Sequence, residues 1–160
     1  AREVSAPEPP GLGLTAAALS SDGTVALTGG RDGATRAWNA MTGAALDAPF
    51  LVGSGTVRGI AYSADGQRVA TASDDGTVRL WDANTGELLV RWPAHGGGAT
   101  DVSFSGDGRF LVSSGADGTV RVYLAQVDDL IDLARSRATR TLTDDECRRF
   151  LHLEACPEDT

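Results

Sequence analysis

The sequence contains one motif written three times at a nearly constant spacing. Each copy has a Ser-x-Asp-Gly turn, then an Asp-Gly pair, then an aromatic residue at the end of the next apolar segment. The aspartates of the second pair are Asp32, Asp75 and Asp117, which sets a period of 43 and then 42 residues. A period of this size predicts stacked supersecondary units, because one such unit cannot bury its apolar face alone.

Within each copy, short apolar segments alternate with turn residues, as in antiparallel strands joined by hairpins. In the middle copy we expect strands at 58–63, 68–73 and 87–92, with another around Val78 and Leu80 that ends at Trp81. The corresponding segments of the other copies are 15–19, 25–29, 35–38 and 44–50, and then 100–105, 110–114 and 120–124. Four such strands form one blade of a β-propeller, and the third copy lacks its fourth strand.

These repeats resemble the WD40 family. In that family a turn aspartate joins a hydrogen-bonded set with a histidine before the first strand, a Ser or Thr in the second strand, and a tryptophan. The matching positions are Asp32, Asp75 and Asp117 for the aspartate, Trp38, Trp81 and Tyr123 for the aromatic residue, and His95 for the histidine. No copy carries the complete set, so we expect the blades to depend mainly on packing and backbone ladders.

The resemblance covers residues 1–127 and implies an all-β fold, a WD40 β-propeller segment of three four-stranded blades. The blades are expected at 14–52, 57–93 and 99–126, with an outer strand at 1–7 that completes the third blade or the last blade of a longer ring. Because upstream blades or a second copy of the chain would be needed to close a propeller, we expect such a partner.

Residues 128–160 are expected to form a short α-helical C-terminal cap. Apolar residues recur there at helical spacing, and a capping box stands at 143–146. This stretch is similar to tails that follow WD40 repeats in large bacterial signalling proteins, many of them STAND-type NTPases or protein kinases. That resemblance implies a C-terminal portion of a cytoplasmic regulator, with any catalytic domain upstream.

Several kinds of chemistry find no support in the sequence. The net charge of −8 disfavours nucleic acid and anionic membranes as partners, and no phosphate-binding loop, nucleophile elbow or calcium loop occurs. We therefore expect no catalytic residues, no metal and no cofactor. Cys147, His152 and Cys156 leave three interpretations open: buried thiols, a disulfide, or an incomplete zinc site.

Internal comparison separates positions that serve the fold from positions that can serve recognition. The repeated aspartates and the arginines four residues after them are identical in all three copies, whereas the residues beside them vary. From the variable positions we select four candidates for contact with a protein or peptide partner: Arg31, Arg58, Asp74 and Asp101. The alternatives are a self-assembling structural ring and a propeller enzyme with an active site in its channel.

Overall fold

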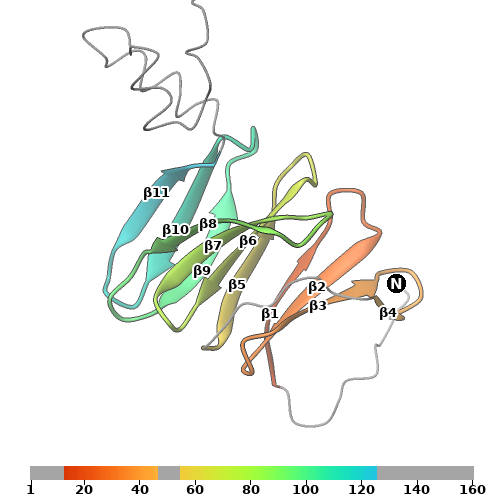
Figure 1. Cartoon of the computed structure of the whole chain (residues 1–160), viewed down its shortest axis with the longest axis horizontal. Helices are drawn as coiled ribbons and strands as arrows, with labels where there is room; N and C mark the ends of the chain where they lie inside the picture. Colours follow the sequence, from red (N-terminus) through yellow and green to blue (C-terminus); the bar gives the residue numbers. More distant parts are fainter. Residues whose placement is uncertain (1–12, 47–54, 126–160) are drawn as a thin grey trace, which may run out of the picture. The chain divides into compact units, whose positions relative to one another are not determined.

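The computed structural model describes residues 13–46 and 55–125, which form eleven strands in three antiparallel sheets (Figure 1). The predicted all-β fold class is confirmed, and the described residues contain no helix. The chain divides into a unit of residues 1–126 and a second unit of residues 127–160. The expected outer strand at 1–7 and the expected helical cap at 128–160 lie outside the described residues.

Each sheet follows the order of the chain, so each is a meander of hairpins. The first sheet contains β1 (Leu14–Leu19), β2 (Val25–Gly30), β3 (Thr35–Asn39) and β4 (Ala45–Leu46). The second contains β5 (Val57–Tyr62), β6 (Arg68–Ser73), β7 (Thr77–Asp82) and β8 (Leu88–Pro93). The third contains β9 (Ala99–Phe104), β10 (Phe110–Gly115) and β11 (Val120–Leu124), and has no fourth strand among the described residues.

The Ser-x-Asp-Gly motif forms the hairpin between the first and second strands of each sheet. In the second sheet Ser63 Oγ donates to Asp65 Oδ1 at 2.5 Å, and the same oxygen accepts from Gln67 N at 3.0 Å. Gly66 has a φ of 70°, in the left-handed region that glycine adopts without a steric penalty. The repeated motif is therefore a turn device, because each of its polar groups is used to hold the hairpin.

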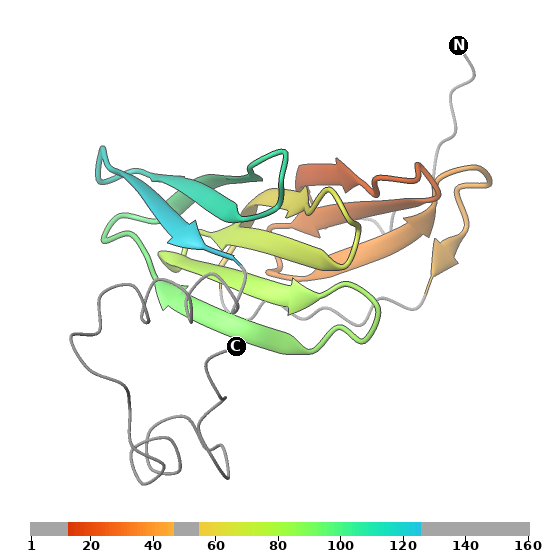
Figure 2. The same cartoon turned by 90° about the horizontal axis from the view of Figure 1, so that it is seen from above.

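Alternate residues of the middle sheet face different neighbours. Val78 and Leu80 on β7 belong to an apolar cluster with Leu111 of the third sheet, whereas Trp81 belongs to a cluster with Leu27 of the first. The first strands of the three sheets are also neighbours, with β5 in contact with both β1 and β9 (Figure 2). The period-2 alternation thus buries both faces of the second sheet.

Two of the three aromatic residues at the end of the third strand are tied to the second strand of their own sheet. Trp81 Nε1 donates to Thr71 Oγ1 at 3.0 Å, and Trp38 Nε1 donates to Thr28 Oγ1 at 2.8 Å. Trp81 is 5% exposed, so its indole N–H needs this acceptor. The tryptophan therefore packs between two sheets while its one polar group is satisfied within its own.

The third sheet contains the pairing of His95 with Asp117 that the family positions indicate, although Tyr123 replaces the tryptophan of the motif. The His95 ring lies between Asp117 and Ser113, with Nδ1 at 3.1 Å from Asp117 Oδ1 and Nε2 at 2.8 Å from Ser113 Oγ. Ser113 Oγ in turn lies 3.4 Å from the Tyr123 hydroxyl. Tyrosine replaces tryptophan without breaking the chain of polar contacts, because its hydroxyl reaches the same serine.

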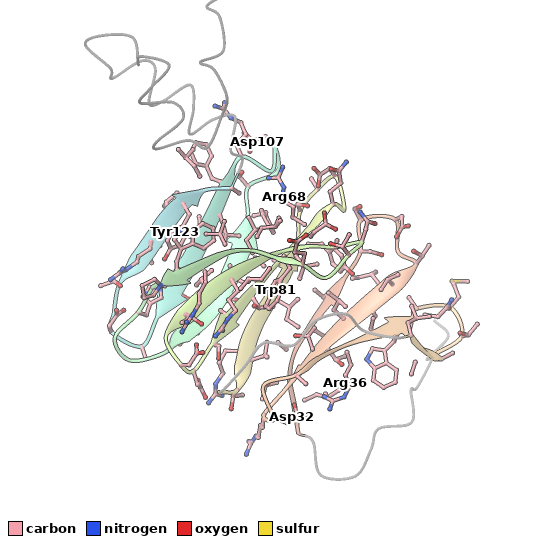
Figure 3. The ribbon with its side chains drawn as sticks, in the orientation of Figure 1. Asp32, Arg36, Arg68, Trp81, Asp107 and Tyr123 are labelled. Atoms are coloured by element: carbon pink, nitrogen blue, oxygen red, sulfur yellow. The ribbon has the colours of Figure 1, made fainter. Side chains whose placement is uncertain are left out.

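One contact joins the second and third sheets at the end that carries the Ser-x-Asp-Gly turns. Arg68 begins β6, and its Nη1 donates to the carbonyl oxygen of Ala125 at 2.6 Å, just past the end of β11. Arg68 and Asp107 lie at one end of the sheets, away from Asp32 and Arg36 at the other (Figure 3). The second sheet thereby holds the last described residue of the third.

Replacing Trp81 by alanine should destabilise the protein more than any exposed apolar truncation. Loss of this buried indole is expected to cost about 3–5 kcal/mol of unfolding free energy, as for other large core aromatics. Leu89→Ala is the matched control, because Leu89 is 47% exposed on the outer strand β8. Equal melting temperatures for the two variants would contradict the assignment of Trp81 as the anchor between the first and second sheets.

Stability should fall as the solution is acidified, and Asp117 should contribute to that fall. Hydrogen bonds from Thr119 and His95 hold the pKa of the Asp117 carboxyl well below its ordinary value. A carboxyl with a depressed folded pKa stabilises the protein above its unfolded pKa of about 3.9, and this contribution is lost as the pH falls further.

Urea unfolding midpoints between about pH 5 and pH 2 measure this effect. Asp117→Asn should flatten the dependence on pH, because the amide at this position does not take up a proton in this range. A profile unchanged by Asp117→Asn would count against the role of this carboxylate.

Candidate partner-binding rim

The turn between the second and third strands lies beside the start of the first strand in every sheet. Arg31 N donates to Gly13 O at 3.2 Å, Asp74 N to Thr56 O at 2.9 Å, and Ala116 N to Gly98 O at 3.0 Å. We call the end of the sheets formed by residues 13–15, 31–33, 56–58, 74–76, 98–101 and 116–118 the turn rim. The variable positions on both sides of this contact thus share one edge, as the internal comparison predicts.

Arg58 and Asp74 form a two-pronged ion pair on the turn rim of the second sheet. Arg58 Nε donates to Asp74 Oδ1 at 2.7 Å, and Arg58 Nη2 donates to Asp74 Oδ2 at 2.8 Å. The hydrogen bond from Arg58 lowers the pKa of Asp74, and the same bond raises the pKa of Arg58. Both side chains are exposed, so the pair presents a fixed pattern of opposite charges to solvent.

Arg31 occupies the same turn position in the first sheet that Asp74 occupies in the second. It is exposed, and no carboxylate lies within ion-pair distance of it among the described residues. Its side chain passes Gly13, where an added side-chain carbon would lie 3.2 Å from Arg31 Cδ. The guanidinium of Arg31 is therefore presented to solvent over a glycine.

Asp101 lies near the start of β9, in the third sheet, and its side chain lies beside β5 of the second sheet. A side-chain carbon at Gly59 would lie 2.8 Å from Asp101 Oδ1, so the glycine makes room for this carboxylate. Asp101 Oδ1 accepts from Val102 N at 2.9 Å, and the residue as a whole is exposed. Asp101 thus places a carboxylate beside Gly59 of β5, which is the residue that follows Arg58.

Backbone contacts between sheets hold these pieces of the turn rim together. The Thr15 hydroxyl donates to the carbonyl oxygen of Val57, directly before Arg58. On the other side, Gly76 O accepts from both Ala94 N and His95 N at 2.9 Å. The Thr15 hydroxyl thus links the first sheet to the second. The segment after β8 links the second sheet to the third, because Gly96 N donates to Asp117 Oδ2 at 3.2 Å.

The repeated aspartates of the same turns serve the fold. Asp32 Oδ2 accepts from Arg36 Nη2 at 2.6 Å, a pair seen at the lower end of Figure 3, and Asp75 Oδ2 accepts from Arg79 Nη2 at 2.7 Å. Burial raises the pKa of Asp75, but hydrogen bonds from Arg79 and Thr77 outweigh burial, so its pKa lies below the ordinary value. These carboxylates are therefore occupied internally and are poor candidates for contact with a partner.

Reasoning from the sequence named Arg58 and Asp74 separately and missed that they pair with each other. It also missed the Asp-to-Arg pairs at 32/36 and 75/79, although the identical spacing of these residues in the repeats carried the signal. A third missed feature is the contact between Thr100 Oγ1 and Ser114 Oγ at 2.8 Å. Thr100 is equivalent to Arg58 in the repeat, but Ala116 stands at the position of Asp74, so the third sheet has no counterpart of the Arg58–Asp74 ion pair at these positions. The sequence gives no sign of this contact, because the two residues lie on different strands, 14 positions apart.

The described residues show neither a metal-binding group nor a membrane span. No group of three or more His, Cys, Asp or Glu side chains within residues 13–46 and 55–125 is arranged to hold a metal ion. In the same part of the chain, no helix is long and apolar enough to cross a membrane. Cys147, His152 and Cys156 lie outside the described residues.

Known proteins share the fold and the repeat. Two solved structures are similar: one described as the crystal structure of RRP9 WD40 repeats (21% identity, TM-score 0.67) and one described as the structure of U3-55K (20% identity, TM-score 0.67). Each similarity covers 73% of this chain and 37% of the other, so the chain spans little more than a third of those proteins. No curated protein sequence matches the chain.

The family profile described as WD domain, G-beta repeat matches residues 10–39, 49–82 and 86–123. WD40 repeats generally mediate protein–protein interaction. The three matches cover more than half of the chain and recur with the period of the repeated turns, and the chain belongs to the WD40-repeat family.

Proposed function

We propose that this chain is a non-catalytic scaffold that binds or senses a protein or peptide through its turn rim. The observation that carries the proposal is the set of Arg31, the Arg58–Asp74 pair and Asp101, presented on one backbone-braced edge. Exposed charges on rigid turns suit recognition, because the scaffold fixes their spacing before a partner arrives. Their order also makes the rim basic at the first sheet and acidic at the third.

The assignment of His95 supports binding rather than catalysis. His95 is the one histidine of the described residues, it is 5% exposed, and both of its ring nitrogens contact polar groups of the third sheet. A general base needs an open path to its substrate, which a buried ring held at both nitrogens lacks. The channel-enzyme alternative therefore has no supporting residue in the described part of the chain.

The outer flank of the third sheet favours a neighbouring blade as a second partner. Val120 and Val122 are 67% and 62% exposed, whereas Val78 and Leu80, at the same repeat positions, are buried against the third sheet. The repeat thus predicts what covers this flank, which is the next blade of a longer chain or of a second copy. The short span of this chain relative to the matched structures supports upstream blades of the same protein.

The wider setting follows from the resemblance of the tail and from composition. All 14 basic residues are arginine, which is typical of proteins from high-GC bacterial genomes, and two cysteines suit a reducing compartment. We place the chain in the C-terminal propeller portion of a larger bacterial regulator in the cytoplasm. Upstream residues would then supply any signalling activity, and this portion would select the partner.

Reversing charges on the turn rim should release the partner without unfolding the protein. Arg31→Glu and Asp101→Arg are each expected to weaken partner capture by at least about tenfold, which corresponds to about 1.4 kcal/mol. Arg109→Glu is the matched control for Arg31→Glu, because it makes the same charge change in the turn before β10 that contains Asp107, at the opposite end of the sheets from Asp32. Affinity capture from the native cytoplasm, with quantitative mass spectrometry, gives the readout, and an identical set of captured proteins for all three variants would refute the rim.

The purified 160-residue chain should self-associate through its open flank. Closed propellers have about 4–8 blades, and apolar flanks left in water favour assembly. Light scattering at micromolar concentration should show dimers or larger species, which Val122→Glu reduces and Leu89→Glu, on an exposed outer strand, does not. A stable wild-type monomer would show that the flank needs no second blade.

A further inference from the structure

Two polar groups on one wall of the interface between the first and second sheets have unused hydrogen-bonding capacity. Arg79 is 6% exposed, and its Nη1 has no hydrogen-bond partner among the described residues. Thr71 is 0% exposed and accepts from Trp81 Nε1, but no acceptor for its own hydroxyl proton occurs in the described part of the chain. Arg79 and Thr71 are directly paired across β7 and β6, so both project from the same face of the sheet.

The opposite wall of this interface carries a third unused polar group. Thr35, on β3 of the first sheet, is 2% exposed, and its Oγ1 has no partner among the described residues. It lies on the same face of β3 as Ala37, which packs in the cluster that contains Trp81. Valine stands at the equivalent positions of the other repeats, Val78 and Val120, so the hydroxyl is particular to this interface.

In the third sheet, a histidine side chain connects the two groups that correspond to the turn aspartate and to Thr71. There the His95 ring bridges the turn aspartate Asp117 and Ser113, the residue equivalent to Thr71. In the second sheet Arg79 replaces the histidine as the partner of the turn aspartate, through Nη2 alone. In the second sheet Asp75 binds Arg79 and Thr71 binds Trp81, but no hydrogen bond among the described residues connects the Arg79 guanidinium to the Thr71 hydroxyl.

We propose that one buried water molecule bridges Arg79 Nη1 and Thr71 Oγ1, at the place that the His95 ring occupies in the third sheet, with Thr35 Oγ1 as its third partner. The water accepts from Arg79 and exchanges hydrogen bonds with the two hydroxyls. Three polar partners are the usual coordination of a buried water. The Asp75 carboxylate already balances the Arg79 guanidinium at 2.7 Å. A neutral ligand therefore fits, whereas an added anion would lie near a carboxylate whose side chain is only 16% exposed.

A crystal structure of the intact chain at a resolution that shows ordered water tests the site directly. Water-to-protein nuclear Overhauser contacts provide the solution test, and a long-lived water should give cross-peaks to the Thr71 methyl group. Thr71→Ser keeps a hydroxyl and should retain the water, whereas Thr71→Val should lose it. The Trp81 indole N–H resonance reports separately on the loss of its acceptor in the valine variant.

Thr35→Val serves as a second variant, because it installs the residue of the other repeats and leaves the Trp81 contact intact. We expect the water to persist on two partners in this variant and to exchange faster with solvent. The proposal is overturned if Arg79 Nη1 bonds a main-chain carbonyl directly, if an anion occupies the site, or if the wild type and Thr71→Ser both lack a long-lived water.

Discussion

The turn aspartate is the group on which the rest of this structure depends. Asp32, Asp75 and Asp117 each accept a backbone N–H two residues further on, which closes the turn between the second and third strands. The remaining carboxylate oxygen takes a cationic or imidazole partner from the same repeat frame. Because the neighbouring variable residue is held by that closed turn, the same carboxylate that builds the blade also sets where the rim side chains stand.

Strands and turns could be predicted from the sequence because they depend on local chemistry repeated in register. The positions of Asp, Gly and the terminal aromatic residue recur at a fixed period, so each copy checks the others. The expected strand at 68–73 agrees with β6, and the others described begin within a residue or so of their predicted bounds. The four rim candidates were selected by the same comparison, and their role in binding stays a prediction.

The features that the sequence could not supply depend on side chains from different strands or on the choice among several partners. His95 was known to match the family position, but its bridge to Tyr123 through Ser113 required the distance across β10 and β11. Arg79 and Arg121 are identical in the repeat, yet Arg79 is buried on Asp75 and Arg121 is exposed because His95 takes the carboxylate. Identity of sequence therefore does not imply identity of role, even inside one chain.

The contact of Arg68 with the carbonyl oxygen of Ala125 has a mechanical consequence. A force on the chain beyond Ala125 acts on β11, the edge strand of a three-stranded sheet, and on the hydrogen bond from Ala125 N to Arg109 O at 2.8 Å. Because Arg68 Nη1 also donates to the Ala125 carbonyl oxygen at 2.6 Å, part of the load passes to the second sheet, which has four strands. The repeat thus has a tether point at which tension on the downstream residues is distributed between two blades.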